Sequence, residues 1–214
     1  GAAENILNST RATDFITPKS RVSRVFRDSV LELAEHYPFA RALVNSGRLS
    51  RPCSYEACSP LNSPDAANFD AGLRPGRPGE DAPIRTDGQP GWLLNQLGNG
   101  FHLLLDGRLD ESEAETLAHE LKPALEASSD LSLLVIGPAP QSLTVLPRSR
   151  LIEDPQGLIA QRYDLQAGSA YLIRPDQHIS ARWRQPTQTA IAAALRRALG
   201  HELTRFQEAQ HALA

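Results

Sequence analysis

Methionine is absent from this chain of 214 residues, cysteine occurs only twice, and no apolar run approaches the roughly 20 residues that a membrane helix needs. The first ten residues, GAAENILNST, have neither the basic start nor the apolar core of a signal peptide. We therefore expect a cytoplasmic location and no membrane partner. The lack of methionine and the leading Gly1 indicate a fragment or a processed piece of a longer protein.

An excess of positive charge is missing too. Charged residues make up 22% of the chain, hydrophobic residues make up 41%, and the formal net charge is -3, which is the composition of an ordinary globular protein. Without a basic surplus, a nucleic-acid partner is not expected. The length suits one large domain, or one medium domain with a substantial appendage.

The sequence motifs of common active sites are absent as well. The chain has no GxGxxG, no P-loop and no GxSxG. Cys53 and Cys58 lie in a Pro/Ser-rich stretch, at a spacing that fits neither CxxC nor half of a zinc site. No two histidines stand at metal-ligand spacing on one helix face; the six are His36, His102, His119, His178, His201 and His211. We expect no catalytic, cofactor-binding or metal-binding residue in this chain.

Residues 1–60 predict a helical pair. Thr17 can cap a helix that has Pro18 at its first position, and apolar residues follow at helical spacing over about 18–36. A shorter helix begins at Pro38, and Asn45-Ser46-Gly47 should end it. The next stretch is rich in Pro, Gly, Ser and Asp without a sustained period, so we expect residues 61–91 to be a linker that wraps over a surface.

Residues 92–200 begin with a strand, a helix and a strand. GFHLLLDG at 100–107 and LSLLVIG at 131–137 predict the strands, the second one buried on both faces. Between them, Asp110 and Glu113 form a capping box for a helix that Pro123 should kink or end.

After a weaker apolar run at 143–146, Asp154-Pro155 should start a short helix. Strands at 170–174 and 178–183 then form a hairpin around Pro175-Asp176-Gln177, with Ile179, Ala181 and Trp183 on one face. Thr187 can cap a last helix that Gly200 ends, and residues 201–214 are expected to add a tail helix. The order strand, helix, strand, helix, hairpin, helix predicts a thioredoxin-like α/β sandwich, with a central mixed sheet and flanking helices.

A working thioredoxin needs a CxxC after its first core strand, because the helix N-terminus there lowers a thiol pKa and a neighbouring thiol resolves the mixed disulfide. Here the corresponding residues, 106–114, read DGRLDESEA, and the proline that usually precedes the third core strand is replaced by Gly168-Ser169. We therefore expect a thioredoxin-like domain that has lost its thiol chemistry. RPDQH at 174–178 combines Arg174, Asp176 and His178 in the manner of a catalytic site, but its position at a turn favours a structural role.

Five stretches, taken together, resemble one family. They are ENILNSTRATDFITPKS (4–20), VFRDSVLELAEHYPFARALVNSGRLS (25–50), RPGEDAPI (77–84), GWLLNQLGNGFHLLL (91–105) and RYDLQAGSAYLIRPDQHISARW (162–183). They are similar to the C-terminal part of FAD-dependent aromatic hydroxylases of the phenol hydroxylase type, including dichlorophenol and hydroxyphenylpropionate hydroxylases. The resemblance covers most of the chain, in the family's order.

The resemblance implies that residues 1–60 complete a flavoprotein body and that a thioredoxin-like domain used for packing and homodimer contacts follows a crossing linker. It implies FAD as the cofactor and NAD(P)H as the reductant of a parent monooxygenase in aromatic hydrocarbon catabolism, with the flavin-binding motifs upstream of this region. In the family the hairpin turn generally reads Pro-Asp-Gly, where this chain has Gln177. If that position keeps a left-handed backbone, Gln177 costs about 1 kcal/mol, and Gln177→Gly should raise the melting temperature.

Two other interpretations remain open. The chain could be a free-standing thioredoxin-like binding or redox module that uses Cys53 or Cys58, or a pure interaction protein that docks through its helices at 18–47.

Overall fold

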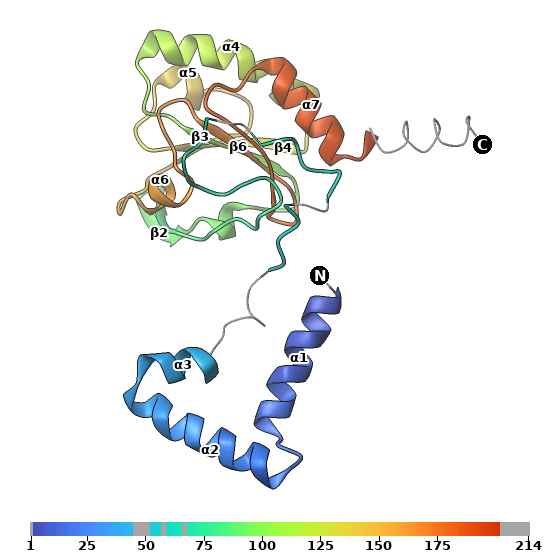
Figure 1. Cartoon of the computed structure of the whole chain (residues 1–214). Coiled ribbons are helices and arrows are strands. Elements are labelled where there is room, and N and C mark those ends of the chain that lie inside the picture. Colours follow the sequence, from blue (N-terminus) through green and yellow to red (C-terminus); the bar gives the residue numbers. More distant parts are fainter. Residues whose placement is uncertain (1, 45–51, 57–58, 66–67, 202–214) are drawn as a thin grey trace, which may run out of the picture. The chain divides into compact units, whose positions relative to one another are not determined.

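The computed structural model describes residues 2–44, 52–56, 59–65 and 68–201. The chain divides into two compact units, Gly1–Ser54 and Tyr55–Ala214 (Figure 1). The boundary lies a few residues before the expected end of the helical segment at 60. Residues 61–91, which we expected to be a linker, belong to the second unit, because their backbone and buried side chains pack on its sheet.

The first unit is helical, with α1 (Ala2–Ile16), α2 (Arg21–His36) and α3 (Pro38–Val44) in its described part. The start predicted for α2 was wrong. Ser20 caps this helix by accepting a hydrogen bond from the Ser23 amide at 3.1 Å. Thr17 cannot do so because its hydroxyl donates to the Thr13 carbonyl at the end of α1. The predicted stop signal at 45–47 lies outside the described residues, as does the predicted tail helix beyond His201.

A five-stranded mixed sheet forms the centre of the second unit (Figure 1), in the order β5-β4-β3-β6-β7. The strands are β3 (Phe101–Asp106), β4 (Leu131–Ile136), β5 (Ser149–Ile152), β6 (Ala170–Ile173) and β7 (Ile179–Trp183). β3, β4 and β5 run parallel, β6 is antiparallel to β3, and β7 is antiparallel to β6. This arrangement confirms the predicted thioredoxin-like α/β fold.

Each face of the sheet has its own apolar core. On one face, α4 (Glu111–Ala127), α5 (Gln141–Thr144) and α7 (Gln188–Ala198) pack on alternate residues of the strands, such as Leu103 and Leu105. On the other face, β1 (Pro83–Thr86), the short 3-10 helix η2 (Leu94–Gln96) and α6 (Leu158–Arg162) contribute residues to the core around Leu104, and β2 (Gln89–Trp92) pairs with β1. The burial of β4 on both faces agrees with its unbroken apolar sequence.

The helix caps predicted in the second unit are confirmed at three side chains. Asp110 and Glu113 form the capping box of α4, and Thr187 caps α7. The Asp154 carboxylate accepts the first amides of α6, although this helix begins at Leu158 rather than next to Pro155. α4 continues through Pro123 to Ala127, because Leu121, Ala124 and Leu125 are buried against the sheet and hold the last turn in place.

The strand alternation predicted for β7 was wrong at its first residue. Ile179 pairs with Ile173 and Ala181 pairs with Leu172, so Ser180 is an extra residue in the ladder. Because of this bulge, Ile179 joins the core of one face, whereas Ala181 joins the core of the other.

A segment that we call the strap, the described residues of 59–79, covers the outer edge of β7. The Ser63 amide donates to the Ser180 carbonyl at 2.8 Å, and the Gly76 amide donates to the Ile179 carbonyl at 2.7 Å. Further along, the Gly79 amide donates to the Gln177 carbonyl at 2.7 Å. The strap thus behaves as an additional edge of the sheet, which explains why Ser180 and Arg182 are buried.

Candidate functional site

The hairpin residues Arg174, Asp176 and His178 do lie together. The Arg174 guanidinium bonds both carboxylate oxygens of Asp176, and the His178 amide donates to the same carboxylate at 3.2 Å. Burial alone would raise the pKa of Asp176, but the hydrogen bond and charge of Arg174 hold this pKa below its ordinary value. The carboxylate therefore stays ionised and organises the turn, as the sequence indicated.

Asn62 of the strap and Tyr55, which precedes the strap, complete this cluster, and no local pattern indicated either residue. The Arg174 guanidinium donates to the Asn62 side-chain oxygen at 3.1 Å, and the Asn62 amide group donates to the Tyr55 carbonyl at 3.2 Å. The Tyr55 ring lies 5.0 Å from the His178 ring, centroid to centroid. The hydrogen bond between Arg174 and Asn62 joins residues 112 positions apart in the chain, which no local pattern can predict. The cluster fixes the strap to the hairpin.

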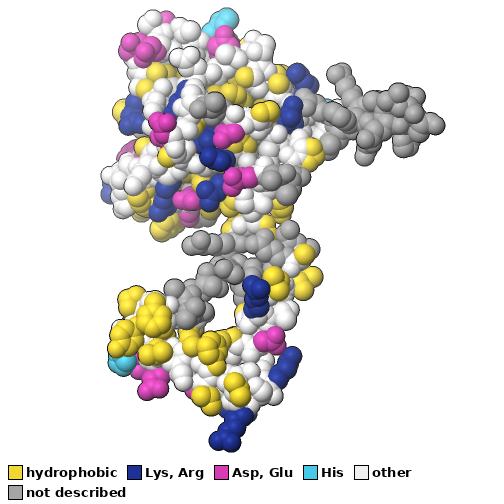
Figure 2. All heavy atoms as spheres, viewed as in Figure 1, with side chains coloured by type: hydrophobic (Ala, Val, Ile, Leu, Met, Phe, Trp, Pro, Cys, Tyr) yellow, Lys and Arg dark blue, Asp and Glu magenta, His cyan; other side chains and the backbone are white. Residues whose placement is uncertain are grey.

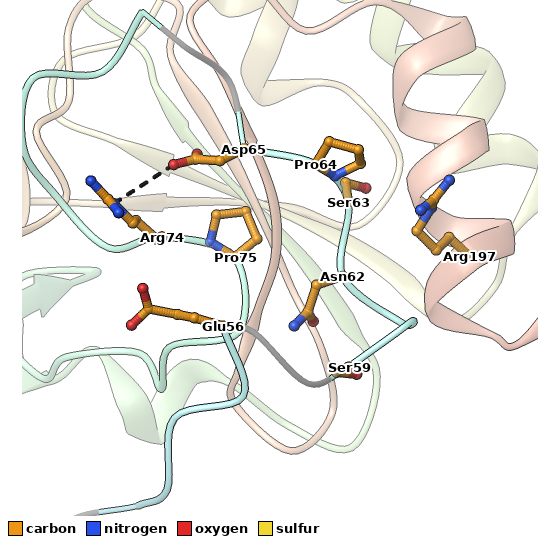
Figure 3. Close-up of a pocket in the computed structure, with 9 residues that line it drawn as sticks. All are labelled: Glu56, Ser59, Asn62, Ser63, Pro64, Asp65, Arg74, Pro75 and Arg197. Carbon is orange, nitrogen blue, oxygen red and sulfur yellow. Dashed lines mark ion pairs between the residues drawn. The ribbon is translucent and has the colours of Figure 1, made fainter.

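A polar cavity of about 420 Å³ lies beside this cluster (Figure 3). Its lining consists of Glu56, Ser59, Asn62, Ser63, Pro64, Asp65, Arg74, Pro75 and Arg197. Its carboxylates have arginine neighbours: Glu56 lies 3.5 Å from Arg77, and Asp65 lies 3.8 Å from Arg74. The cavity lining therefore combines hydroxyl groups with paired charges, and its electrostatic potential is not dominated by one sign of charge.

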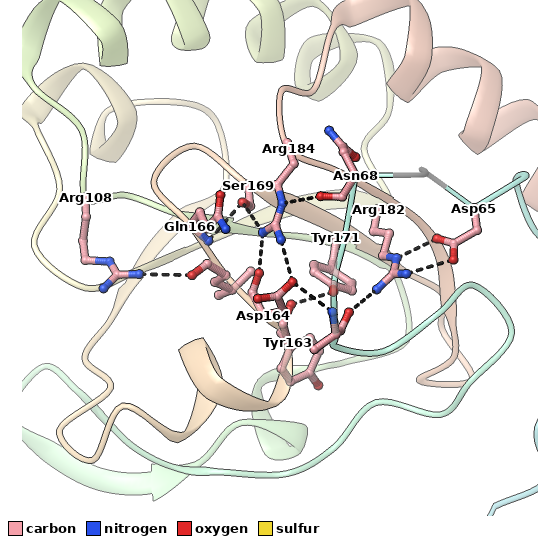
Figure 4. A network of polar contacts seen from close by, with 12 residues as sticks. Asp65, Asn68, Arg108, Tyr163, Asp164, Gln166, Ser169, Tyr171, Arg182 and Arg184 are labelled. Atoms are coloured by element: carbon pink, nitrogen blue, oxygen red, sulfur yellow. Dashed lines mark hydrogen bonds and ion pairs between the residues drawn. The ribbon is translucent and has the colours of Figure 1, made fainter.

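The second polar cluster fixes the strap to β7 and to the turn after α6 (Figure 4). The Arg182 guanidinium makes two hydrogen bonds to Asp65, at 2.6 and 2.8 Å, and one to the Ala71 carbonyl at 2.8 Å. Arg184 bonds the Asp164 carboxylate at 2.5 Å. Both guanidinium groups lie over the Phe69 ring, at 4.4 and 3.9 Å from its centroid. This cation-π contact adds to the ion pairs that hold the strap.

Two tyrosines continue this cluster into the core. The Tyr171 hydroxyl donates to the Tyr163 carbonyl at 2.6 Å, and the Tyr163 hydroxyl donates to the Glu80 carbonyl at 2.9 Å. Burial raises the pKa of both phenols, so they remain neutral and act as hydrogen-bond donors.

An aspartate and an arginine occupy the position where a thioredoxin carries its thiols. Asp106, at the end of β3, is buried, and Arg108 bonds both of its carboxylate oxygens. The hydrogen bond to Asp106 raises the pKa of Arg108. Gly107 between them is required sterically, because a Cβ there would stand 2.6 Å from a Val135 methyl carbon. The Asp110 carboxylate of the capping box accepts the Glu113 amide of α4 at 2.8 Å, so the Asp106, Arg108 and Asp110 side chains all make structural contacts here.

The remaining candidate residues are scattered. Cys53 is partly buried, and Cys58 lies outside the described residues. His36, His119 and His201 are exposed, whereas His102 and His178 are buried in different parts of the sheet. Over the described ranges, no group of three or more His, Cys, Asp or Glu side chains could hold a metal ion. Over the same ranges, no helix has the length and apolar character to cross a membrane.

The fold and these clusters define a thioredoxin-like α/β domain with a strapped sheet edge, preceded by a helical unit. No family model and no curated protein sequence matches the chain. Among solved structures, the flavin-dependent monooxygenase PieE, in complex with FAD and substrate, matches 87% of this chain and 32% of its own, with 20% identity and a TM-score of 0.51.

Aklavinone-11 hydroxylase, in a ternary complex with FAD and aklavinone, matches 81% of this chain and 34% of its own, with 18% identity and a TM-score of 0.51. Peroxidoxin BcpB from Mycobacterium tuberculosis matches 60% of this chain and 97% of its own, with 18% identity and a TM-score of 0.45. The chain therefore spans about a third of the length of the two monooxygenases, and at these identities the likeness is one of fold alone.

Proposed function

We propose that this chain is the C-terminal portion of an FAD- and NAD(P)H-dependent aromatic ring hydroxylase. In this proposal, the helical unit completes the flavin-binding body, and the thioredoxin-like unit serves packing and homodimer contacts. The flavin and the aromatic substrate belong to the parent enzyme, and this chain contributes neither a catalytic nor a cofactor-binding residue.

The observation that carries the proposal is the extent of the structural likeness. The two monooxygenases match 87% and 81% of the chain, which exceeds the three quarters that residues 55–214 make up. The match therefore extends beyond the thioredoxin-like unit into the helices that precede it. Both matched proteins bind FAD in their structures, and this supports FAD as the cofactor of the parent.

The surface of the helical unit supports the same proposal. Val30 and Ala40 are the buried hydrophobic residues in its described part. Val22, Val25 and Phe26 on α2 are 80%, 60% and 61% exposed. Figure 2 shows hydrophobic side chains gathered on these helices. A surface of this kind is typical of a segment that is covered by another part of its protein, and the flavin-binding body is the covering part in our proposal.

The direct test is to express the chain together with the coding region upstream of it. We expect that region to contain a GxGxxG after a predicted strand, and the complete protein to purify with FAD and to oxidise NAD(P)H with an aromatic substrate. The isolated chain should not bind FAD. Tight FAD binding by residues 1–214 alone, or a reading frame that starts just before Ala2, would defeat the proposal; the latter favours a free-standing module.

The role of the helical unit can be tested separately. In the complete protein, Phe26→Asp should lower FAD retention, because it places a charge in the proposed contact between α2 and the flavin-binding body. Arg24→Asp is the control, since it places the same aspartate at an exposed, already charged position of α2, and it changes the net charge by two units where Phe26→Asp changes it by one. Equal FAD loss in the two variants would argue against a contact between Phe26 and the flavin-binding body.

A further inference from the structure

The polar cavity beside Asn62 has no role in the clusters described above. Two parts of the strap, residues 59–65 and 74–75, line it together with Glu56 and with Arg197 of α7 (Figure 3). Its volume of about 420 Å³ falls within the roughly 300–1,000 Å³ of pockets that enclose small organic molecules. The cavity is therefore large enough for a ligand of modest size.

Backbone contacts hold the cavity walls in place. The Ser63 and Gly76 amides donate to carbonyls of β7, and the Tyr55 amide donates to the Gly76 carbonyl at 2.8 Å. Gly76 is required at this point, because its φ is 95° and a Cβ there would stand 2.6 Å from the Glu56 nitrogen. The walls are thus fixed without a ligand, which reduces the conformational entropy that binding has to overcome.

The Arg74 guanidinium has hydrogen-bonding capacity that the protein does not use. Its ion-pair partner, Asp65, already accepts hydrogen bonds from Arg182 on both carboxylate oxygens, at 2.6 and 2.8 Å. The Arg74 Nε lies 3.8 Å from Asp65, beyond hydrogen-bond reach, and this side chain makes no hydrogen bond within the described ranges. Because a guanidinium binds a carboxylate through two parallel hydrogen bonds, Arg74 can receive a carboxylate from solution.

Two serine hydroxyls add uncharged donors to the same lining. The Ser59 oxygen accepts the Leu61 amide at 3.2 Å, which leaves its own proton available. The Ser63 hydroxyl makes no hydrogen bond to any residue that the structure describes, and the rings of Pro64 and Pro75 provide apolar surface beside it. A ligand that matches this lining has a carboxylate, hydroxyl groups and a short carbon skeleton.

We propose that this cavity binds a small hydroxylated carboxylic acid, with Arg74 as the partner of the carboxylate. The inference goes beyond the proposed function and does not depend on the flavoprotein assignment. A phosphate group could also bond the guanidinium, but it carries more negative charge at neutral pH. The carboxylates of Glu56 and Asp65 in the lining repel that additional charge, so the site favours a carboxylate over a phosphate.

Amide chemical shifts of the full chain, kept dilute during an NMR titration, measure binding at residues 59–65 and 74–76. The probe is D-glucuronate, for which we expect a Kd of about 1–10 mM, the affinity of one bidentate ion pair and a few hydroxyl contacts. D-Glucose lacks the carboxylate, acetate lacks the hydroxyl groups, and inorganic phosphate replaces the carboxylate. Each of these three should bind more weakly than D-glucuronate.

Arg74→Gln should raise the Kd for D-glucuronate by at least about tenfold, because it removes a charge-assisted pair of hydrogen bonds. The Arg74 side chain is 67% exposed, so the variant should remain folded. Arg85→Gln makes the same substitution at an exposed position of β1 and should leave the Kd unchanged. Unaltered binding in Arg74→Gln, no shifts with D-glucuronate, or equally tight binding of glucose, acetate or phosphate would overturn the proposal.

Discussion

At the scale of the residue, four positions other than glycine in the described structure have a left-handed backbone: Asp87, Arg148, Asp164 and Gln177. Such a conformation costs about 1 kcal/mol for a residue with a Cβ, and at Arg148, Asp164 and Gln177 side-chain bonds offset the cost. The Arg148 guanidinium, for example, donates to the Leu131 carbonyl at 2.7 Å and to the Ser128 carbonyl at 2.8 Å, and so closes the end of α4. A glycine could not replace these bonds.

Gln177 tests the balance between backbone strain and a side-chain bond. Its φ of 63° is the left-handed conformation that the family's glycine at this turn implied. The rise in melting temperature expected for Gln177→Gly considered only the release of backbone strain. The Gln177 side chain also donates to the Leu94 carbonyl, and such a hydrogen bond contributes about 1 kcal/mol to stability. Alanine loses the bond and keeps the strain. We therefore expect Gln177→Gly to melt about 2–4 °C above Gln177→Ala.

Thermal unfolding of the two variants, followed by circular dichroism, measures this difference. Wild type should melt above Gln177→Ala because it keeps the hydrogen bond. If Gln177→Ala were as stable as Gln177→Gly, the left-handed backbone would carry no measurable strain at this turn.

At the scale of the element, local patterns predicted β3, β4, the β6–β7 hairpin, α4 and α7. Their apolar periods and caps lie within a few neighbouring residues, so the sequence contains the whole signal. α1 was missed because its apolar residues form a weaker one-sided stripe than those of α2. The Thr10 and Thr13 hydroxyls in this helix donate to carbonyls four residues back. The β1–β2 hairpin was missed although Asp87-Gly88, with φ of 51° and 74°, is a typical hairpin turn.

Elements fixed by distant partners could not be predicted in the same way. β5 is a four-residue edge strand whose register depends on β4, and SRLI has no alternation of its own. The strap has no repeating pattern of apolar residues, because its backbone pairs with β7 through single hydrogen bonds at Ser63 and Gly76 and not through a regular ladder. The clusters around Arg174 and Arg182 depend on that pairing, so the sequence placed the hairpin residues but not their partners.

The strap itself should depend on the pair between Asp65 and Arg182. The Arg182 side chain is 2% exposed, so Asp65→Ala leaves a buried guanidinium without its carboxylate. We expect the free energy of unfolding to fall by about 3 kcal/mol. Arg74→Ala is the control: Arg74 lies 3.8 Å from the same carboxylate but its side chain is 67% exposed, so its loss should cost less than about 1 kcal/mol.

Urea denaturation gives both free energies, and limited proteolysis reports on the strap. Asp65→Ala should be cleaved within 59–79 faster than wild type or Arg74→Ala. Similar losses of stability in the two variants would mean that Arg182 finds compensation elsewhere, for example from the Ala71 carbonyl.

At the scale of the whole molecule, the two units differ in how well they bury their own apolar residues. Eleven of the fifteen exposed large hydrophobic residues in the described structure lie before residue 55. The thioredoxin-like unit has two closed cores, one on each face of its sheet. The exposed apolar surface of the described structure is therefore concentrated on the first unit.

This difference predicts distinct solution behaviour for the full chain and for residues 55–214. The full chain should bind a hydrophobic dye such as ANS and self-associate as its concentration rises, because Val22, Val25 and Phe26 on α2 are exposed. Residues 55–214 should bind little dye and remain at constant mass, which light scattering measures. In the full chain, Phe26→Glu should reduce dye binding, whereas Leu199→Glu, at an exposed leucine of the second unit, should change it little. A full chain that stays monomeric without binding the dye would show that the helical unit needs no partner.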